Sequence, residues 1–127
     1  MKFNAPVLAC YEEDGVLTVA LGDAAQPTEN YLIITRLDDD DNDSIDEGVG
    51  LQTSQSAYEQ SAAIEKVILQ SGSLEVVITP DSYQHFGCSS LVGEFSDTLR
   101  NNSEKLALLR KYLEAIFNGT QTTLIFS

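Results

Sequence analysis

Residues 64–78 read Ile64-Glu65-Lys66-Val67-Ile68-Leu69-Gln70-Ser71-Gly72-Ser73-Leu74-Glu75-Val76-Val77-Ile78, and this stretch decides the fold. In its second half the apolar residues Leu74, Val76 and Ile78 occupy alternate positions, which is the period of a strand with one buried face. The first half, Ile64–Leu69, mixes apolar and charged residues and predicts a second strand. A Ser-Gly-Ser step separates the two halves and favours a turn. The stretch therefore predicts a β-hairpin.

Further strands are predicted on the N-terminal side of this hairpin. Val7–Tyr11 and Val16–Leu21 are short apolar runs, and the intervening Asp14-Gly15 step favours a tight hairpin turn. Tyr31–Leu37 is β-branched and almost continuously apolar, which is typical of a strand in the centre of a sheet. Val49–Thr53 predicts one more short strand.

On the C-terminal side the pattern changes to that of a helix. A short helical turn is predicted at residues 80–87, followed by a strand at Leu91–Phe95. We expect the principal helix to begin with Ser103 as its N-cap and to end at Asn118-Gly119. Its apolar residues recur every three or four positions, as on a helix that covers a sheet, at Leu106, Leu109, Leu113 and Ile116. Thr122–Phe126 predicts the last strand.

The order of these elements predicts an α+β fold, with a mainly antiparallel sheet packed against one principal C-terminal helix. The chain has 127 residues, of which 43% are hydrophobic, and this is enough for one core in a single domain spanning residues 1–127. No internal repeat or linker divides it.

The net charge excludes several classes of function. Lys and Arg total 7 against 20 Asp and Glu, so the formal net charge is −13. An acidic surface repels phosphate and anionic lipid, which argues against binding to nucleic acid or to a membrane. No run of 18 apolar residues is present, and the N-terminus lacks the apolar stretch of a secretory signal. We therefore expect a cytoplasmic protein, with Cys10 and Cys88 as reduced thiols.

Much of this charge is concentrated in residues 38–47, where seven of ten side chains are acidic. Without these seven acids the net charge would be −6. Clustered like charges resist packing, so we expect an exposed loop that either serves solubility or binds a basic protein partner. The predicted partner-binding residues are the acids of this segment and one nearby aromatic residue, namely Asp38, Asp39, Asp40, Asp41, Asp43, Asp46, Glu47 and Tyr58.

The same segment suggests a calcium-binding loop as an alternative. Aligned on Asp38, an EF-hand loop has acceptable residues at several ligand positions. The sixth position needs glycine and has Asp43, and the twelfth needs glutamate and has Val49. The alignment thus fails at its two most diagnostic positions, and we expect neither a metal nor a cofactor.

A small enzyme with a Cys–His pair is the other alternative. His85 is the one histidine of the chain, and Cys88 follows it three residues later. Gly87 is expected to break the helical turn between them, and no glycine-rich oxyanion motif accompanies the pair. A zinc site would need further His or Cys ligands, and only Cys10 remains. We therefore expect a non-enzymatic protein.

The sequence resembles one immunity-protein family of bacterial polymorphic toxin systems, family ten. The likeness rests on Tyr31–Arg36 with the acidic stretch after it, on the hairpin at 64–78 and on the Leu109–Phe117 part of the helix. It covers about Val16–Phe117, which is most of the chain. Where the family has a glycine-rich step before the hairpin, this chain has Ala62-Ala63. The resemblance implies that the protein neutralises a cognate toxin, often a nuclease, by binding it in the producing cell. It implies no particular contact residue.

Overall fold

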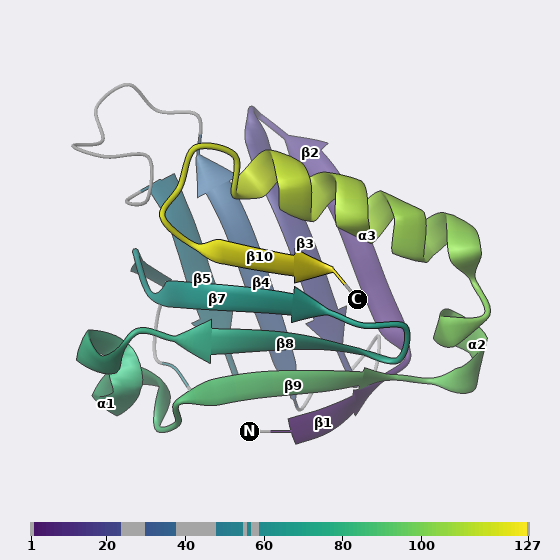
Figure 1. Ribbon diagram of the computed structural model, residues 1–127, viewed down its shortest axis with the longest axis horizontal. Coiled ribbons are helices and arrows are strands. Elements are labelled where there is room, and N and C mark those ends of the chain that lie inside the picture. Colours follow the sequence, from purple (N-terminus) through teal and green to yellow (C-terminus); the bar gives the residue numbers. More distant parts are fainter. Residues whose placement is uncertain (1, 24–29, 38–47, 55, 57–58, 127) are drawn as a thin grey trace.

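The computed structural model describes residues 2–23, 30–37, 48–54, 56 and 59–126, and within this part the strands form two five-stranded sheets (Figure 1). Sheet A has the strand order β1 (Lys2–Ala5), β9 (Ser90–Phe95), β8 (Ser73–Ile78), β7 (Ile64–Leu69) and β10 (Thr123–Phe126). Sheet B has the order β2 (Val7–Glu13), β3 (Val16–Gly22), β4 (Tyr31–Leu37), β5 (Val49–Thr53) and β6 (Gln60–Ser61). The helices are α1 (Tyr83–Phe86), which follows a 3-10 turn at Pro80–Ser82, α2 (Asp97–Arg100) and α3 (Ser103–Ile116).

The α+β class, the mainly antiparallel strands and the C-terminal helix are confirmed. The predicted hairpin is β7 paired with β8, and β4 is the central strand of sheet B. All pairs within sheet B are antiparallel. In sheet A two pairs are parallel, β1 with β9 and β10 with β7. The division of the strands between two sheets was not predicted from the sequence.

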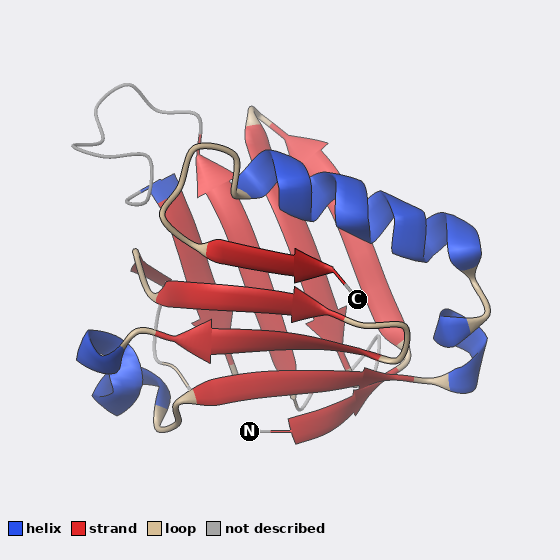
Figure 2. Cartoon of the chain, viewed as in Figure 1, coloured by secondary structure: helices blue, strands red, loops and turns tan. Residues whose placement is uncertain are grey.

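The two sheets and α3 enclose one core. Sheet A and α3 lie together on one face of sheet B, with α3 across β2 and β3 (Figure 2). Alternate residues of each strand point into this space, and the fully buried ones come from all three components, as in Leu21, Ile34, Leu74, Val76, Leu109 and Leu113. Gly93 on β9 allows close contact between the sheets, because a Cβ there would lie 2.3 Å from Cδ2 of Leu21.

Polar contacts hold both ends of α3. At its start the Asn102 side chain accepts a hydrogen bond from the Lys105 N–H, at 3.1 Å, so the N-cap is Asn102 and the prediction of Ser103 was one residue late. At its end the Arg36 Nη1 donates to the carbonyls of Ala115, Ile116 and Asn118 at 2.8, 2.9 and 2.8 Å. Arg36 thus ties the C-terminus of α3 to the central strand of sheet B.

Three short elements were not predicted. β1 and α2 have four residues each and β6 has two, which is too short for a hydrophobic period to be recognised. β1 and β2 are separated by Pro6, which has no N–H to donate, and the chain passes there from sheet A to sheet B. Across the described ranges, no helix is long and apolar enough to cross a membrane.

Candidate protein-binding surface

The predicted partner-binding residues fall outside the described part of the chain. They lie in segment 38–47 and at position 58, so their assignment stays a prediction. The strands that flank the acidic segment in sequence, β4 and β5, are neighbours in sheet B. A surface that includes the acidic segment therefore adjoins sheet B.

One face of sheet B points away from sheet A and α3, and we call it the outer face of sheet B. The strand register determines its members, because buried Leu21 pairs with Leu8 and Leu32, and alternate residues must point the opposite way. On the first three strands of the sheet, β2, β3 and β4, its described side chains are Val7, Ala9, Tyr11, Glu13, Val16, Thr18, Ala20, Tyr31, Ile33 and Thr35. Among these ten residues Glu13 alone is charged.

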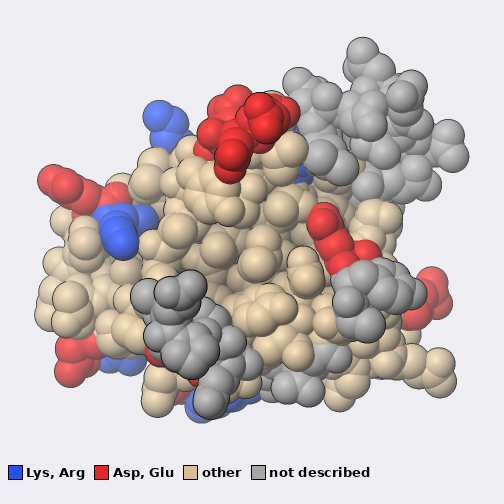
Figure 3. Space-filling view, turned by 180° about the vertical axis from the view of Figure 1, so that it is seen from behind, with Lys and Arg blue, Asp and Glu red and all other residues tan. Residues whose placement is uncertain are grey.

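Acidic side chains border this face. The two-residue turn between β2 and β3 has Asp14 and Gly15 at φ 53° and 80°. Asp14 in this turn and Glu12 and Glu13 at the end of β2 are exposed acids. Near β5, the Glu59 carboxylate accepts a hydrogen bond from the Thr35 hydroxyl at 2.7 Å. Figure 3 shows an uncharged central area with acidic atoms over the β2–β3 turn.

The outer face of sheet A is different. Its strands place Lys2 and Glu94 in an exposed ion pair of 2.8 Å, and Lys66 and Glu75 lie on the same side. Charged residues of both signs are what water-facing strands ordinarily carry. This side of sheet A also includes aliphatic residues, namely Ile68, Val77, Val92 and Ile125. The outer face of sheet B differs in having one charged residue among the ten and in carrying Tyr11 and Tyr31, of which Tyr11 is 45% exposed. An apolar, tyrosine-bearing patch within a polar margin is typical of a protein-binding surface.

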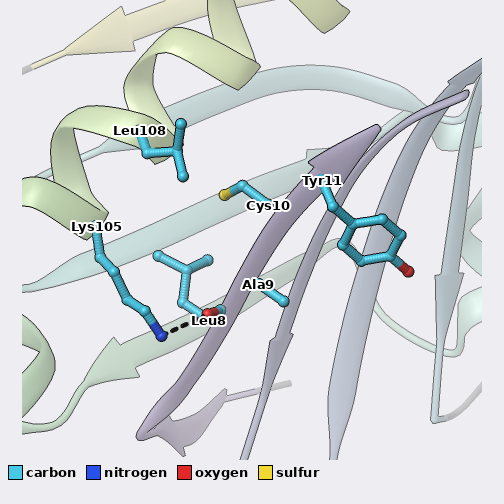
Figure 4. Close-up of a pocket in the computed structure, with 6 residues that line it drawn as sticks. All are labelled: Leu8, Ala9, Cys10, Tyr11, Lys105 and Leu108. Carbon is cyan, nitrogen blue, oxygen red and sulfur yellow. Dashed lines mark hydrogen bonds between the residues drawn. The ribbon is translucent and has the colours of Figure 1, made fainter. Parts of the chain in front are cut away.

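A groove lies beside this face, between strand β2 and helix α3 (Figure 4). It has a volume of about 360 Å³ and is lined by Leu8, Ala9, Cys10, Tyr11, Lys105 and Leu108. The Lys105 Nζ donates to the Leu8 carbonyl at 3.1 Å. Burial raises the pKa of the Cys10 thiol to about 11, and the positive charge of Lys105 opposes the shift. Cys10 is therefore a neutral thiol at pH 7 and no activated nucleophile.

The raised pKa of Cys10 predicts a pH-dependent stability. The ordinary pKa of the thiol is 9.0, so between pH 9 and 11 the folded protein keeps a proton that the unfolded chain releases. Stability from this group is complete below pH 9 and falls as the pH rises toward 11. Urea denaturation at pH 8.5 and 10.5 should show a larger loss in the wild type than in Cys10→Ala. Equal losses in the two proteins would contradict the assignment to Cys10.

The alternative of an enzyme with a Cys–His pair involves His85 in helix α1 and Cys88 just after its end. The His85 ring packs edge-on against Phe86, with 4.7 Å between the ring centroids. Gly87 has a φ of 72° and ends the helix before Cys88, as expected. Within the described ranges, no group of three or more His, Cys, Asp or Glu is arranged to hold a metal ion. The calcium alternative concerns the acidic segment, which lies outside those ranges.

A comparison with protein-family models and with curated protein sequences finds no match to this chain. The candidate surface thus rests on the structure. Tyr11 and Ile33 were not predicted from the sequence as surface residues, although the apolar pattern of their strands indicated them. Because strands β2, β3 and β4 are apolar at both odd and even positions, both faces of an antiparallel sheet are apolar, and one of them is left over after the core is formed.

Proposed function

We propose that this protein is a non-enzymatic binding protein that neutralises a cognate bacterial toxin by protein–protein contact. The observation that carries the proposal is the outer face of sheet B, with its uncharged centre, its two tyrosines and its acidic border. The resemblance to an immunity-protein family supplies the toxin as the class of partner. The net charge of −13 favours a basic toxin.

In this proposal the two parts of the surface have different tasks. Tyr11, Tyr31 and Ile33 supply apolar area that a partner can bury, and buried aromatic side chains commonly dominate the energy of an interface. Glu12, Glu13 and Asp14 lie at the margin, where they remain in contact with water and attract a basic partner over long range. The acids of segment 38–47 would add to this attraction.

The experiment that tests the proposal uses the toxin encoded beside the gene for this protein. Purified protein in excess should bind that toxin in a pull-down and should abolish its activity. An unrelated acidic protein of similar size and charge serves as the control for non-specific binding. Full toxin activity in the presence of excess protein would rule the proposal out.

Charge reversal in the acidic segment is expected to slow association with the toxin. Replacing Asp39, Asp40 and Asp41 with lysine should lower the association rate about 10-fold or more at low salt, and less at high salt, because salt screens long-range attraction. The matched control makes the same change in net charge at three exposed acids elsewhere, Glu65, Asp81 and Glu104. Equal association rates for the two triple variants would restrict segment 38–47 to a role in solubility.

A further inference from the structure

The free edge of sheet B carries backbone groups that no described strand uses. β2 is the first strand of the sheet, and among the described strands it pairs with β3 alone. Glu13 and Val16 flank a two-residue turn, and residues in that position form a hydrogen-bonded pair. Hydrogen-bonded pairs recur at every second residue, so the backbone N–H and C=O groups of Tyr11, Ala9 and Val7 are also directed at β3. The N–H and C=O groups of Leu8, Cys10 and Glu12 therefore point away from the sheet.

The contact with Lys105 agrees with this assignment. Its Nζ reaches the Leu8 carbonyl from α3, on the side opposite β3, at 3.1 Å. This bond satisfies one of the outward groups. Lysine at an edge strand is a known device against pairing with other chains. Here it protects the Leu8 end of the edge, while Cys10 and Glu12 continue the row beyond it.

Side chains of helix α3 form one wall of the groove along this edge. Leu108 and Lys105 project from α3 toward β2, and the Cys10 side chain points toward Leu108 (Figure 4). Leu108 is 41% exposed, and together with Leu8 and Cys10 it makes one side of the groove apolar. An extended chain placed in the groove would pair with the β2 backbone and bury every second side chain beneath α3.

We propose that the groove along β2 binds an extended segment of a partner protein, which joins sheet B as an additional strand. Unpaired edge backbone beside an apolar wall is the arrangement used in recognition by strand addition. The segment would carry an apolar residue that packs on Leu108 and a Lys or Arg that faces Glu12, which is on the same side of β2 as Leu8 and Cys10. The net charge of −13 disfavours a second copy of this chain as the occupant. The proposal does not require the partner to be a toxin.

The first measurement is hydrogen exchange of the backbone amides by NMR. In the free protein the amides of Cys10 and Glu12 should exchange rapidly, while those of Ala9 and Tyr11 are protected by β3. A random eight-residue peptide library displayed on phage is then selected on the wild-type protein, and enriched peptides are synthesised. Binding of such a peptide should protect Cys10 and Glu12, and its sequence should alternate apolar with basic or polar residues.

Two variants of α3 locate the binding site. Leu108→Glu places a carboxylate on the apolar wall and should weaken peptide binding at least about 10-fold. Ala107→Glu adds the same charge at the neighbouring exposed position, outside the residues that line the groove, and should bind like the wild type. Circular dichroism checks that both variants are folded, which is expected because both positions are exposed on a helix.

Three results would overturn the proposal. One is protection of Cys10 and Glu12 in the free, dilute protein, since the edge would then already be occupied. Another is that none of the selected peptides binds the wild type more tightly than it binds Leu108→Glu. The last is protection that appears only as the protein concentration rises, with dimers in sedimentation, because the occupant would then be a second copy.

Discussion

Replacing Arg36 with methionine is expected to lower the free energy of unfolding by about 2–3 kcal/mol. The Arg36 Nη1 donates to three carbonyls at the end of α3, at 2.8 to 2.9 Å. The carbonyls of Ala115 and Ile116 are in the last turn of the helix and lack partners within it, and the Asn118 carbonyl follows just beyond. The partial negative charge at this end is stabilised by a cation. Methionine keeps most of the length and apolar character of the side chain but donates no hydrogen bond. The expected loss therefore reports on the hydrogen bonds and the charge.

Urea denaturation at neutral pH measures this effect. Lys111→Met is the matched control, because it also removes one positive charge, at an exposed position on α3. A substitution at such a surface position ordinarily changes stability by no more than about 0.5 kcal/mol. Arg36→Lys should fall between the wild type and Arg36→Met, since lysine keeps the positive charge and N–H donors but its side chain is shorter and not planar. Similar stabilities for Arg36→Met and Lys111→Met would show that Arg36 does not anchor the helix.

The parts of the fold that the sequence predicted are those with a strong local period. Strand β8 of the hairpin and helix α3 show their hydrophobic period within one element, and β4 is recognisable as a continuous apolar, β-branched run. The assignment of strands to sheets depends on contacts between distant residues. β10 pairs with β7, and β1 pairs with β9. The paired residues are far apart in the sequence, so no local pattern predicts these pairs.

The candidate site was harder to predict than the fold. Clustered acids can be recognised directly in a sequence, and the predicted site was therefore placed in segment 38–47. Apolar residues on a surface cannot be told from core residues until the packing of the sheets is known. Ile33 and Ile34 illustrate this, because they are identical neighbours in β4. Ile34 is fully buried and points into the core, while Ile33 is on the outer face of sheet B. The free edge of β2 could not be predicted from the sequence either, because it depends on the order of the described strands in sheet B.

Ile33→Lys should weaken toxin binding at least about 100-fold, which corresponds to about 2.7 kcal/mol. Ile33 lies on the central strand of sheet B, in the cross-strand row of Ala9 and Ala20, next to the row that runs from Tyr11 to Thr35 on the outer face. A lysine there would have to lose its water of hydration in the complex, and it would also repel a basic partner. Isothermal calorimetry with the toxin encoded beside the gene measures the change in affinity.

The matched control for Ile33→Lys is Ile68→Lys. Ile68 is also half-buried and lies on the outward side of a strand with neighbours on both sides, β7, but on sheet A. The two variants therefore have the same net charge and comparable effects on folding, and they differ in the face that they alter. If Ile33→Lys binds the toxin as tightly as Ile68→Lys does, the outer face of sheet B is not the interface. If Ile68→Lys alone fails to bind, the interface lies on sheet A, with its mixed charges.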